Sequence, residues 1–171
     1  MARHPSQPLQ PLIWLGVPLL LALVATLIFA APLRVWGLAL PEPVFPLVLA
    51  FAWAVIRPSL LGPWLLLLGG LFLDLFWGGP LGLWGLSLLI AYAVTLLGRS
   101  LMVGQDVRVL FGWYLVANVV AFSCCYFFLL LDAKTAPNLA STFWQLAAST
   151  ALFPAAYRLI ERFEDADIRF R

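Results

Sequence analysis

The 41 residues between Arg57 and Arg99 contain a single charged side chain, that of Asp74. As one continuous α-helix, this stretch would be about 60 Å long, roughly twice the thickness of a bilayer's hydrocarbon core. It therefore has to turn back on itself. The segment Gly78-Gly79-Pro80 supplies the turn, because glycine tolerates unusual backbone angles and proline fixes φ. The sequence thus predicts a helical hairpin with Asp74 close to its tip.

The composition of the whole chain extends this argument to a membrane. Of the 171 residues, 64% are hydrophobic and 11% are charged, and the mean hydropathy is +1.00. Soluble domains carry about 25% charged residues, and domains of this size bury only about 70% of the surface of the unfolded chain. The excess apolar surface must therefore face lipid. We expect an all-α polytopic membrane protein with a compact bundle of helices.

Sparse charges and turn signals divide the chain into six apolar segments. The predicted spans are about residues 12–31, 44–56, 62–77, 81–98, 109–131 and 140–160, which together form one transmembrane domain over residues 1–160. Only 14 residues separate Glu42 from Arg57, so we expect the second span to be tilted, sheltered by neighbours or partly irregular. Pro154 is expected to kink the last helix. Residues 161–171 are expected to form a cytoplasmic amphipathic tail.

The distribution of basic residues gives the expected orientation. With six spans and a cytoplasmic N-terminus, the outer side receives only Arg34 and Lys134. The cytoplasmic side receives Arg3, Arg57, Arg99, Arg108, Arg158, Arg162, Arg169 and Arg171. Positive residues favour the cytoplasmic side of membrane proteins. The sequence therefore predicts a multi-pass protein of a cytoplasmic (inner) membrane with both termini inside the cell.

Several classes of function lack the residues they need. The net charge of +2 and the scattered basic residues give no indication of nucleic-acid binding. One histidine and two adjacent cysteines, Cys124 and Cys125, do not make a usual transition-metal site. The chain has no Ser/His/Asp set, no Cys/His pair and no phosphate-binding loop of the Gly-x-x-x-x-Gly-Lys type. We therefore expect neither an enzyme nor a bound cofactor.

Asp74 is the acidic residue that lies within the apolar spans away from their ends, and such carboxylates are candidates for function. It precedes Gly78 by only four residues, about one helical turn. There it is able to meet water or to cap the positive end of the fourth helix. We favour this structural role over a partner contact, and a partner contact over proton or substrate handling. Neighbouring glycines are expected to let the two arms pack closely: Gly69, Gly70, Gly78, Gly79, Gly82 and Gly85.

Few polar residues lie in the last two spans: Asn118, Ser123, Gln145, Ser149 and Thr150. We interpret them as hydrogen-bonding groups between helices, in preference to a ligand site.

The central stretch resembles one known family. Residues 51–58, 70–82 and 91–92 are similar to the rod-shape-determining protein MreD family, whose members show Gly-x-x-x-Asp-x-x-x-Gly-x-x-x-Gly across the third and fourth spans. Gly70, Asp74, Gly78 and Gly82 occupy those places, and Pro80-Leu81-Gly82 matches a common form of the motif. Pro154, the chain length and the six expected spans also fit. The acidic-basic tail after Arg162 departs from the pattern, which leaves open what the tail contacts.

The resemblance implies a non-enzymatic membrane scaffold of the elongation (Rod) complex. It implies direct binding to MreC and, through the complex, to MreB, RodA and the elongation penicillin-binding protein, within the lipids of the bacterial inner membrane. Such a scaffold helps to couple MreB filaments to peptidoglycan synthesis and rod cell shape. The structural or partner-contact motif would comprise Gly70, Asp74, Gly78, Gly79, Pro80, Gly82 and Gly85. From the glycine cluster itself, we expect the partner's single membrane helix in a groove beside the third or fourth span.

An alternative comes from a different class of protein. The S components of energy-coupling-factor vitamin transporters are six-helix bodies of similar size, and the MreD family resembles them in fold. Such a subunit needs a polar pocket on its outer side. This chain offers at most Asp74, Asn118, Lys134 and Gln145 for such a pocket, so we prefer the scaffold.

Overall fold

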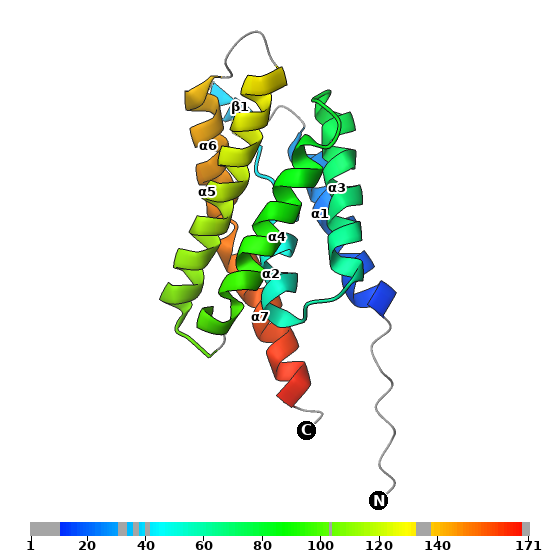
Figure 1. Ribbon diagram of the computed structural model, residues 1–171, viewed down its shortest axis with the longest axis vertical. Helices are drawn as coiled ribbons and strands as arrows, with labels where there is room; N and C mark the ends of the chain where they lie inside the picture. The colour runs from blue at the N-terminus through cyan, green and yellow to red at the C-terminus, as the bar shows by residue number, and fades with distance from the viewer. Residues whose placement is uncertain are drawn as a thin grey trace, which may run out of the picture.

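The computed structural model describes residues 11–30, 34–35, 38–39, 42–102, 104–132 and 138–168, and these form a helical bundle (Figure 1). In chain order the helices are α1 (Pro11–Phe29), α2 (Pro46–Ile56), α3 (Leu61–Trp77), α4 (Leu83–Met102), α5 (Val107–Asp132), α6 (Leu139–Thr150) and α7 (Phe153–Ile168). The expected all-helical bundle is confirmed. A small addition is the antiparallel pair of two-residue strands β1 (Arg34–Val35) and β2 (Leu38–Ala39) between α1 and α2.

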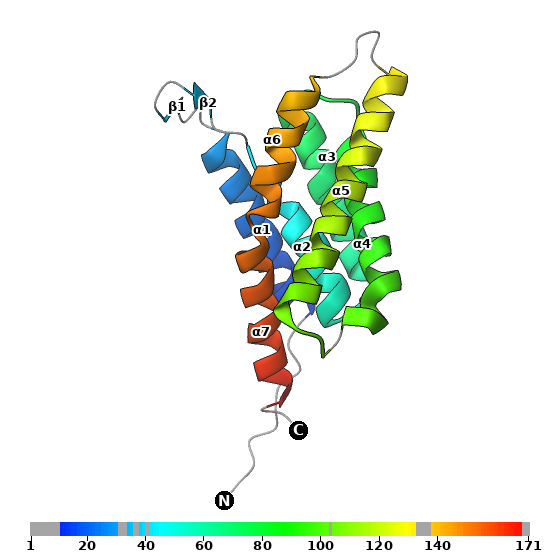
Figure 2. The ribbon, with the colours of Figure 1, turned by 90° about the vertical axis from the view of Figure 1, so that its left-hand side faces the viewer.

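The short helix α2 lies at the centre of the bundle. All of its residues from Pro46 to Val55 are buried, and both ribbon views show it enclosed by the longer helices (Figures 1 and 2). At 1.5 Å per residue, its 11 residues span only about 16 Å. Of the three possibilities for this segment, the structure shows a regular helix that is sheltered by its neighbours.

The last predicted span is two helices in the structure. We expected one helix over 140–160 with a kink at Pro154, but α6 ends at Thr150 and α7 begins at Phe153. A proline has no N–H to give to the carbonyl four residues earlier, and its ring clashes with that carbonyl. The helix therefore stops at Thr150, and Pro154 lies in the first turn of α7, where no N–H is needed.

The predicted cytoplasmic tail is largely a continuation of α7, which runs to Ile168. Residues 169–171 lie outside the described residues. The other boundaries shift less: α3 and α5 lie within two residues of the predicted bounds, while α4 begins at Leu83 and extends four residues beyond 98. Residue 31, the predicted end of the first span, also lies outside the described residues.

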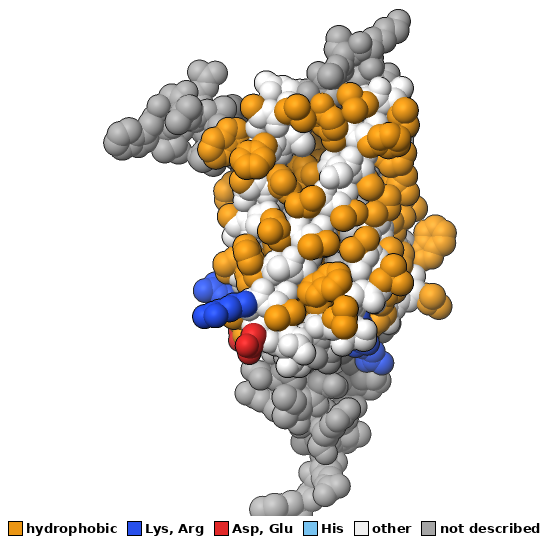
Figure 3. Space-filling model, turned by 60° about the vertical axis from the view of Figure 1, so that its left-hand side comes forward, with side chains coloured by type: hydrophobic (Ala, Val, Ile, Leu, Met, Phe, Trp, Pro, Cys, Tyr) orange, Lys and Arg blue, Asp and Glu red, His pale blue; other side chains and the backbone are white. Residues whose placement is uncertain are grey.

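Length and composition identify two helices that are able to cross a membrane, Leu83–Met102 and Val107–Leu131. The segments Trp14–Phe29, Pro46–Ile56 and Leu61–Trp77 are apolar but shorter. Large hydrophobic side chains cover the face shown in Figure 3, and charged side chains gather at one end of that face. These features are those of a bundle associated with a membrane.

Candidate functional site

The connection between α3 and α4 is a tight turn built on two glycines. Gly78 caps the C-terminus of α3 with φ +67°, and Gly82 precedes α4 with φ +93°. Both angles lie in the left-handed region, which side chains disfavour. A Cβ atom on either glycine would find no atom within 4 Å. These two glycines are therefore needed for backbone conformation and do not form a small-residue packing face.

Asp74 ties the end of α3 to the start of α4. Its Oδ2 accepts a hydrogen bond of 2.8 Å from the N–H of Gly82, and its Oδ1 accepts one of 2.9 Å from the N–H of Trp84. The first N–H groups of a helix have no partner within the helix and carry a partial positive charge. The carboxylate thus caps α4 from a neighbouring helix. Its side chain is 0% exposed, so the alternative in which Asp74 meets water is wrong.

Two other glycines allow the arms of this hairpin to touch. A Cβ atom on Gly70 would lie 2.3 Å from both the Cα and the N of Gly85. No real side chain fits at that distance, so the backbones of α3 and α4 are in direct contact here. The glycines of the motif therefore serve two purposes: Gly70 and Gly85 permit close approach, whereas Gly78 and Gly82 permit the turn.

A tryptophan cluster surrounds the hairpin and includes an acid that sequence reasoning did not single out. The Nε1–H of Trp77 donates a 2.8 Å hydrogen bond to Oε2 of Glu42. The ring of Trp77 lies 5.5 Å from that of Trp84, which in turn lies 5.4 Å from Phe122. Glu42 stands between two prolines just before the second apolar segment begins, and that isolated position is its only sequence signal.

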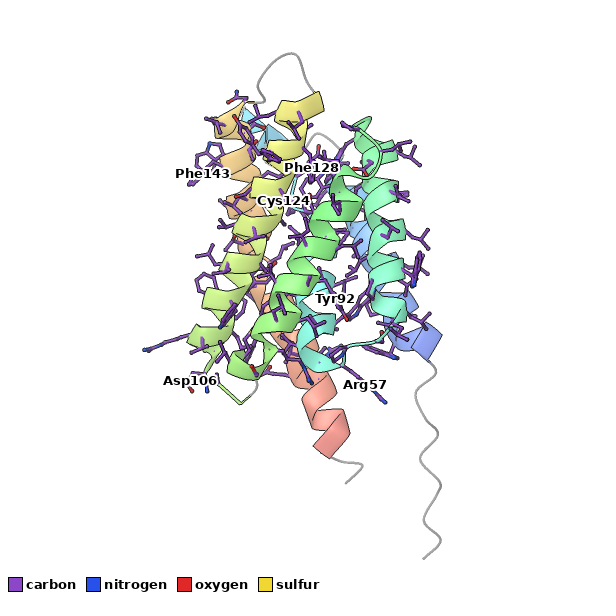
Figure 4. The ribbon with its side chains drawn as sticks, viewed as in Figure 1. Arg57, Tyr92, Asp106, Cys124, Phe128 and Phe143 are labelled. Atoms are coloured by element: carbon purple, nitrogen blue, oxygen red, sulfur yellow. The ribbon has the colours of Figure 1, made fainter. Side chains whose placement is uncertain are left out.

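An apolar groove runs beside the hairpin, between the start of α4 and the end of α5. It has a volume of about 430 Å³. The lining residues are Pro80, Leu81, Gly82, Leu83, Leu86, Phe128 and Leu131. Phe128 lies on the side of α5 that faces α4 (Figure 4). Pro80 and Gly82, two residues of the predicted motif, are thus brought to the wall of a groove, while Asp74 is buried behind them.

A second polar arrangement lies where α6 ends. The hydroxyl of Tyr114 donates to the carbonyl of Ser149 at 2.9 Å, and the Oγ of Ser149 accepts from the N–H of Val44 at 2.9 Å. Asn118 donates from Nδ2 to the carbonyl of Tyr114, and Thr150 bonds within its own helix. Of the polar residues predicted to join helices, Ser149 does so. Tyr114 was missed, because an aromatic residue in an apolar helix gives no separate sequence signal.

At the opposite end of the bundle from the hairpin, Arg99 on α4 closes the C-terminus of α2. Its Nε donates to the carbonyl of Val55 at 2.9 Å, and its Nη2 donates to the carbonyl of Ile56 at 3.4 Å. The terminal carbonyls of a buried helix need such partners. The arginine entered the sequence argument only as a topology marker.

In the part of the chain that the structure describes, no group of three or more His, Cys, Asp or Glu side chains is placed to hold a metal ion. The fold and the site define a small apolar helical bundle whose glycine-rich hairpin is closed by a buried carboxylate. Searches of the chain against protein-family models, curated proteins and solved structures found no match.

Proposed function

We propose that this chain is a non-enzymatic scaffold of the bacterial elongation machinery, similar to the MreD family, and that it binds MreC in the inner membrane. Through that complex it helps to connect MreB filaments with RodA and the elongation penicillin-binding protein. The observation that carries the proposal is the apolar groove beside the Asp74 hairpin. Its wall contains residues of the motif on which the family resemblance depends.

The scaffold crosses the membrane six times, with α6 and α7 together forming the last crossing and both termini in the cytoplasm. Exposed apolar side chains support this placement, for example Leu20 on α1 (63% exposed) and Leu68 on α3 (60%). Arg57 and Asp106 lie at the same end of the bundle (Figure 4), which is the end that the basic residues assign to the cytoplasm.

The groove suits a single apolar helix from the partner. In lipid, apolar burial does not drive helices together, so association depends on close packing between preformed surfaces. Asp74 and the Gly70–Gly85 contact fix the hairpin that forms one wall, and Phe128 and Leu131 form the other. Because the groove is already fixed, little conformational entropy is lost when a partner binds there. A vitamin-binding S component instead needs polar groups, and the groove lining is apolar.

Site-specific photocrosslinking tests the proposal in native membranes. A photoreactive residue replaces Leu86 or Leu131 in the groove wall, and a control replaces Leu68, an exposed leucine of α3 that does not line the groove. We expect an adduct with MreC from the two groove positions and none from Leu68. Equal adducts from all three positions, or an adduct with the ATPase and coupling subunits of a transporter, would contradict the scaffold.

A loss-of-contact variant gives an independent measurement. Leu86→Ala removes part of the groove wall, and Leu68→Ala removes the same atoms from a different exposed position. We expect Leu86→Ala to lower the amount of MreC that co-purifies in mild detergent, whereas Leu68→Ala leaves it unchanged. Unchanged recovery with Leu86→Ala would place the partner on another face.

A further inference from the structure

Two arginines from distant parts of the chain, Arg57 and Arg99, lie at the end of the bundle opposite the hairpin. Arg57 directly follows α2 and is exposed. Arg99 reaches from α4 to the carbonyls of Val55 and Ile56, the two residues that precede Arg57. The Arg99 guanidinium therefore lies against the same short piece of backbone that carries Arg57.

The loop that carries Arg57 is held in position from both sides. Tyr92, on α4, packs against the end of this loop: a Cβ atom on Gly62 would lie 3.7 Å from its hydroxyl oxygen. The Oγ of Ser59 accepts a 3.1 Å hydrogen bond from the N–H of Gly62, in the first turn of α3. Figure 4 shows Tyr92 beside the α2–α3 connection and Arg57 at its lower end. A fixed loop presents its charge with little entropy to lose on binding.

Among the described residues, neither of these two charges has a counter-ion. Arg99 directs two of its N–H groups at neutral backbone carbonyls, and neither arginine forms an ion pair with a described residue. A guanidinium has five N–H donors, so Arg99 keeps donors that this arrangement does not use. Arginine matches the geometry of phosphate oxygens, with which it forms two parallel hydrogen bonds. The site is complementary to a phosphate group.

The surface next to the arginine pair is strongly apolar. Leu60, three residues after Arg57, is 92% exposed, and Trp64 on the first turn of α3 is 66% exposed. Tryptophan is enriched at the level of lipid headgroups. A basic pair beside exposed leucine and tryptophan therefore matches a ligand that carries both a phosphate and a hydrocarbon chain.

We propose that Arg57 and Arg99 bind the phosphate of an anionic phospholipid of the cytoplasmic leaflet, and that its acyl chain lies over Leu60 and Trp64. Basic pockets between helices on the cytoplasmic side are known to bind such headgroups. The proposal rests on the membrane placement in the proposed function and is independent of the protein partner in the groove.

Lipid binding to the purified full-length protein tests this site. The protein is stripped of lipid in a neutral detergent and titrated with phosphatidylglycerol or with phosphatidylcholine, and bound lipids are counted by native mass spectrometry. We expect phosphatidylglycerol to bind more tightly than phosphatidylcholine. Arg57→Gln should lower the affinity for phosphatidylglycerol by about tenfold, the usual range for losing a hydrogen-bonded charge, and Arg57→Lys should lower it by less.

Arg108→Gln is the matched control, because Arg108 is an exposed arginine at the start of α5 and the change in charge is the same. Arg57 is the test position because Arg99 also closes the end of α2, so its loss would disturb folding. If Arg57→Gln and Arg108→Gln lower the affinity for phosphatidylglycerol equally, binding depends only on the overall charge of the protein, and the proposal is overturned.

Two other outcomes also overturn it. The first is equal binding of the two lipids. The second is competition by inorganic phosphate, at constant ionic strength, as effective as that of phosphatidylglycerol, which would identify a site for free phosphate. A negative result in the lipid-binding experiment does not affect the photocrosslinking result, because Leu86 and Leu131 lie at the other end of the bundle. The two proposals are thus tested separately.

Discussion

Replacing Asp74 by alanine should strongly destabilise the bundle. The change leaves the N–H groups of Gly82 and Trp84 without their acceptor, and the hydrogen bond to Trp84 is buried. A hydrogen bond to a charged group contributes about 1.5–3 kcal/mol. Two such bonds lost at a helix terminus give an expected decrease of about 3–5 kcal/mol in the free energy of unfolding. Native proteins have only about 5–15 kcal/mol in total.

Asp74→Asn isolates the hydrogen bonds from any change in volume. An asparagine has nearly the shape of an aspartate but keeps one acceptor oxygen, and its NH₂ group would face an N–H donor of the α4 terminus. One of the two bonds should survive and the other become a clash between donors. We therefore expect a smaller loss, about 2–3 kcal/mol.

The measurement is the free energy of unfolding of the purified protein in mixed micelles with increasing denaturing detergent, followed by circular dichroism. Asp106→Asn is the control, because Asp106 is an exposed aspartate between α4 and α5. Exposed substitutions usually change stability by less than about 0.5 kcal/mol. If Asp74→Asn unfolds within about 0.5 kcal/mol of the unmodified protein, the capping argument is refuted.

Two further predictions concern the packing of the helices. Gly70→Ala places a Cβ atom 2.3 Å from the facing backbone of α4 and should lower the unfolding free energy by about 1–3 kcal/mol. The control Gly112→Ala, with open space around it, should instead raise it by up to about 1 kcal/mol. Equal effects of the two variants would contradict the close contact. Tyr114→Phe removes the hydrogen bond to the last turn of α6 and should cost about 1 kcal/mol. Tyr126→Phe, at a half-buried tyrosine with no hydrogen bond to a described residue, should cost less, and the reverse order would contradict this role of Tyr114.

The hairpin could be predicted from the sequence because its causes are local. One charge in 41 residues forces a turn, and a Gly-Gly-Pro sequence gives its position. Asp74 lies one helical turn before Gly78, so the start of the next helix is within reach of its side chain. The particular contact between Gly70 and Gly85 could not be predicted in this way, because Gly70 lies eight residues before Gly78 and Gly85 only three after Gly82, so the turn alone does not give the register of the two arms.

The remaining contacts join residues that no spacing rule connects. Trp77 and Glu42 are 35 residues apart, and Arg99 and Val55 are 44 apart. Pro154 shows a different difficulty, since the same proline is compatible with a kink or with a break. A break exposes carbonyl groups of the last turn of α6, and Tyr114 supplies a donor to one of them. The sequence does not reveal that this donor is in reach.

The short helix α2 shows why these long-range contacts matter. A helix of about 16 Å, buried from Pro46 to Val55, leaves terminal N–H and C=O groups that need partners outside the helix. Ser149 accepts from the N–H of Val44 just before the helix, and Arg99 donates to the carbonyls at its end. Asp74 does the same for α4. Each of these polar side chains closes a helix terminus, so substitutions there should lower stability. Leu86→Ala in the apolar groove, which removes no such group, should instead lower the binding of the proposed partner.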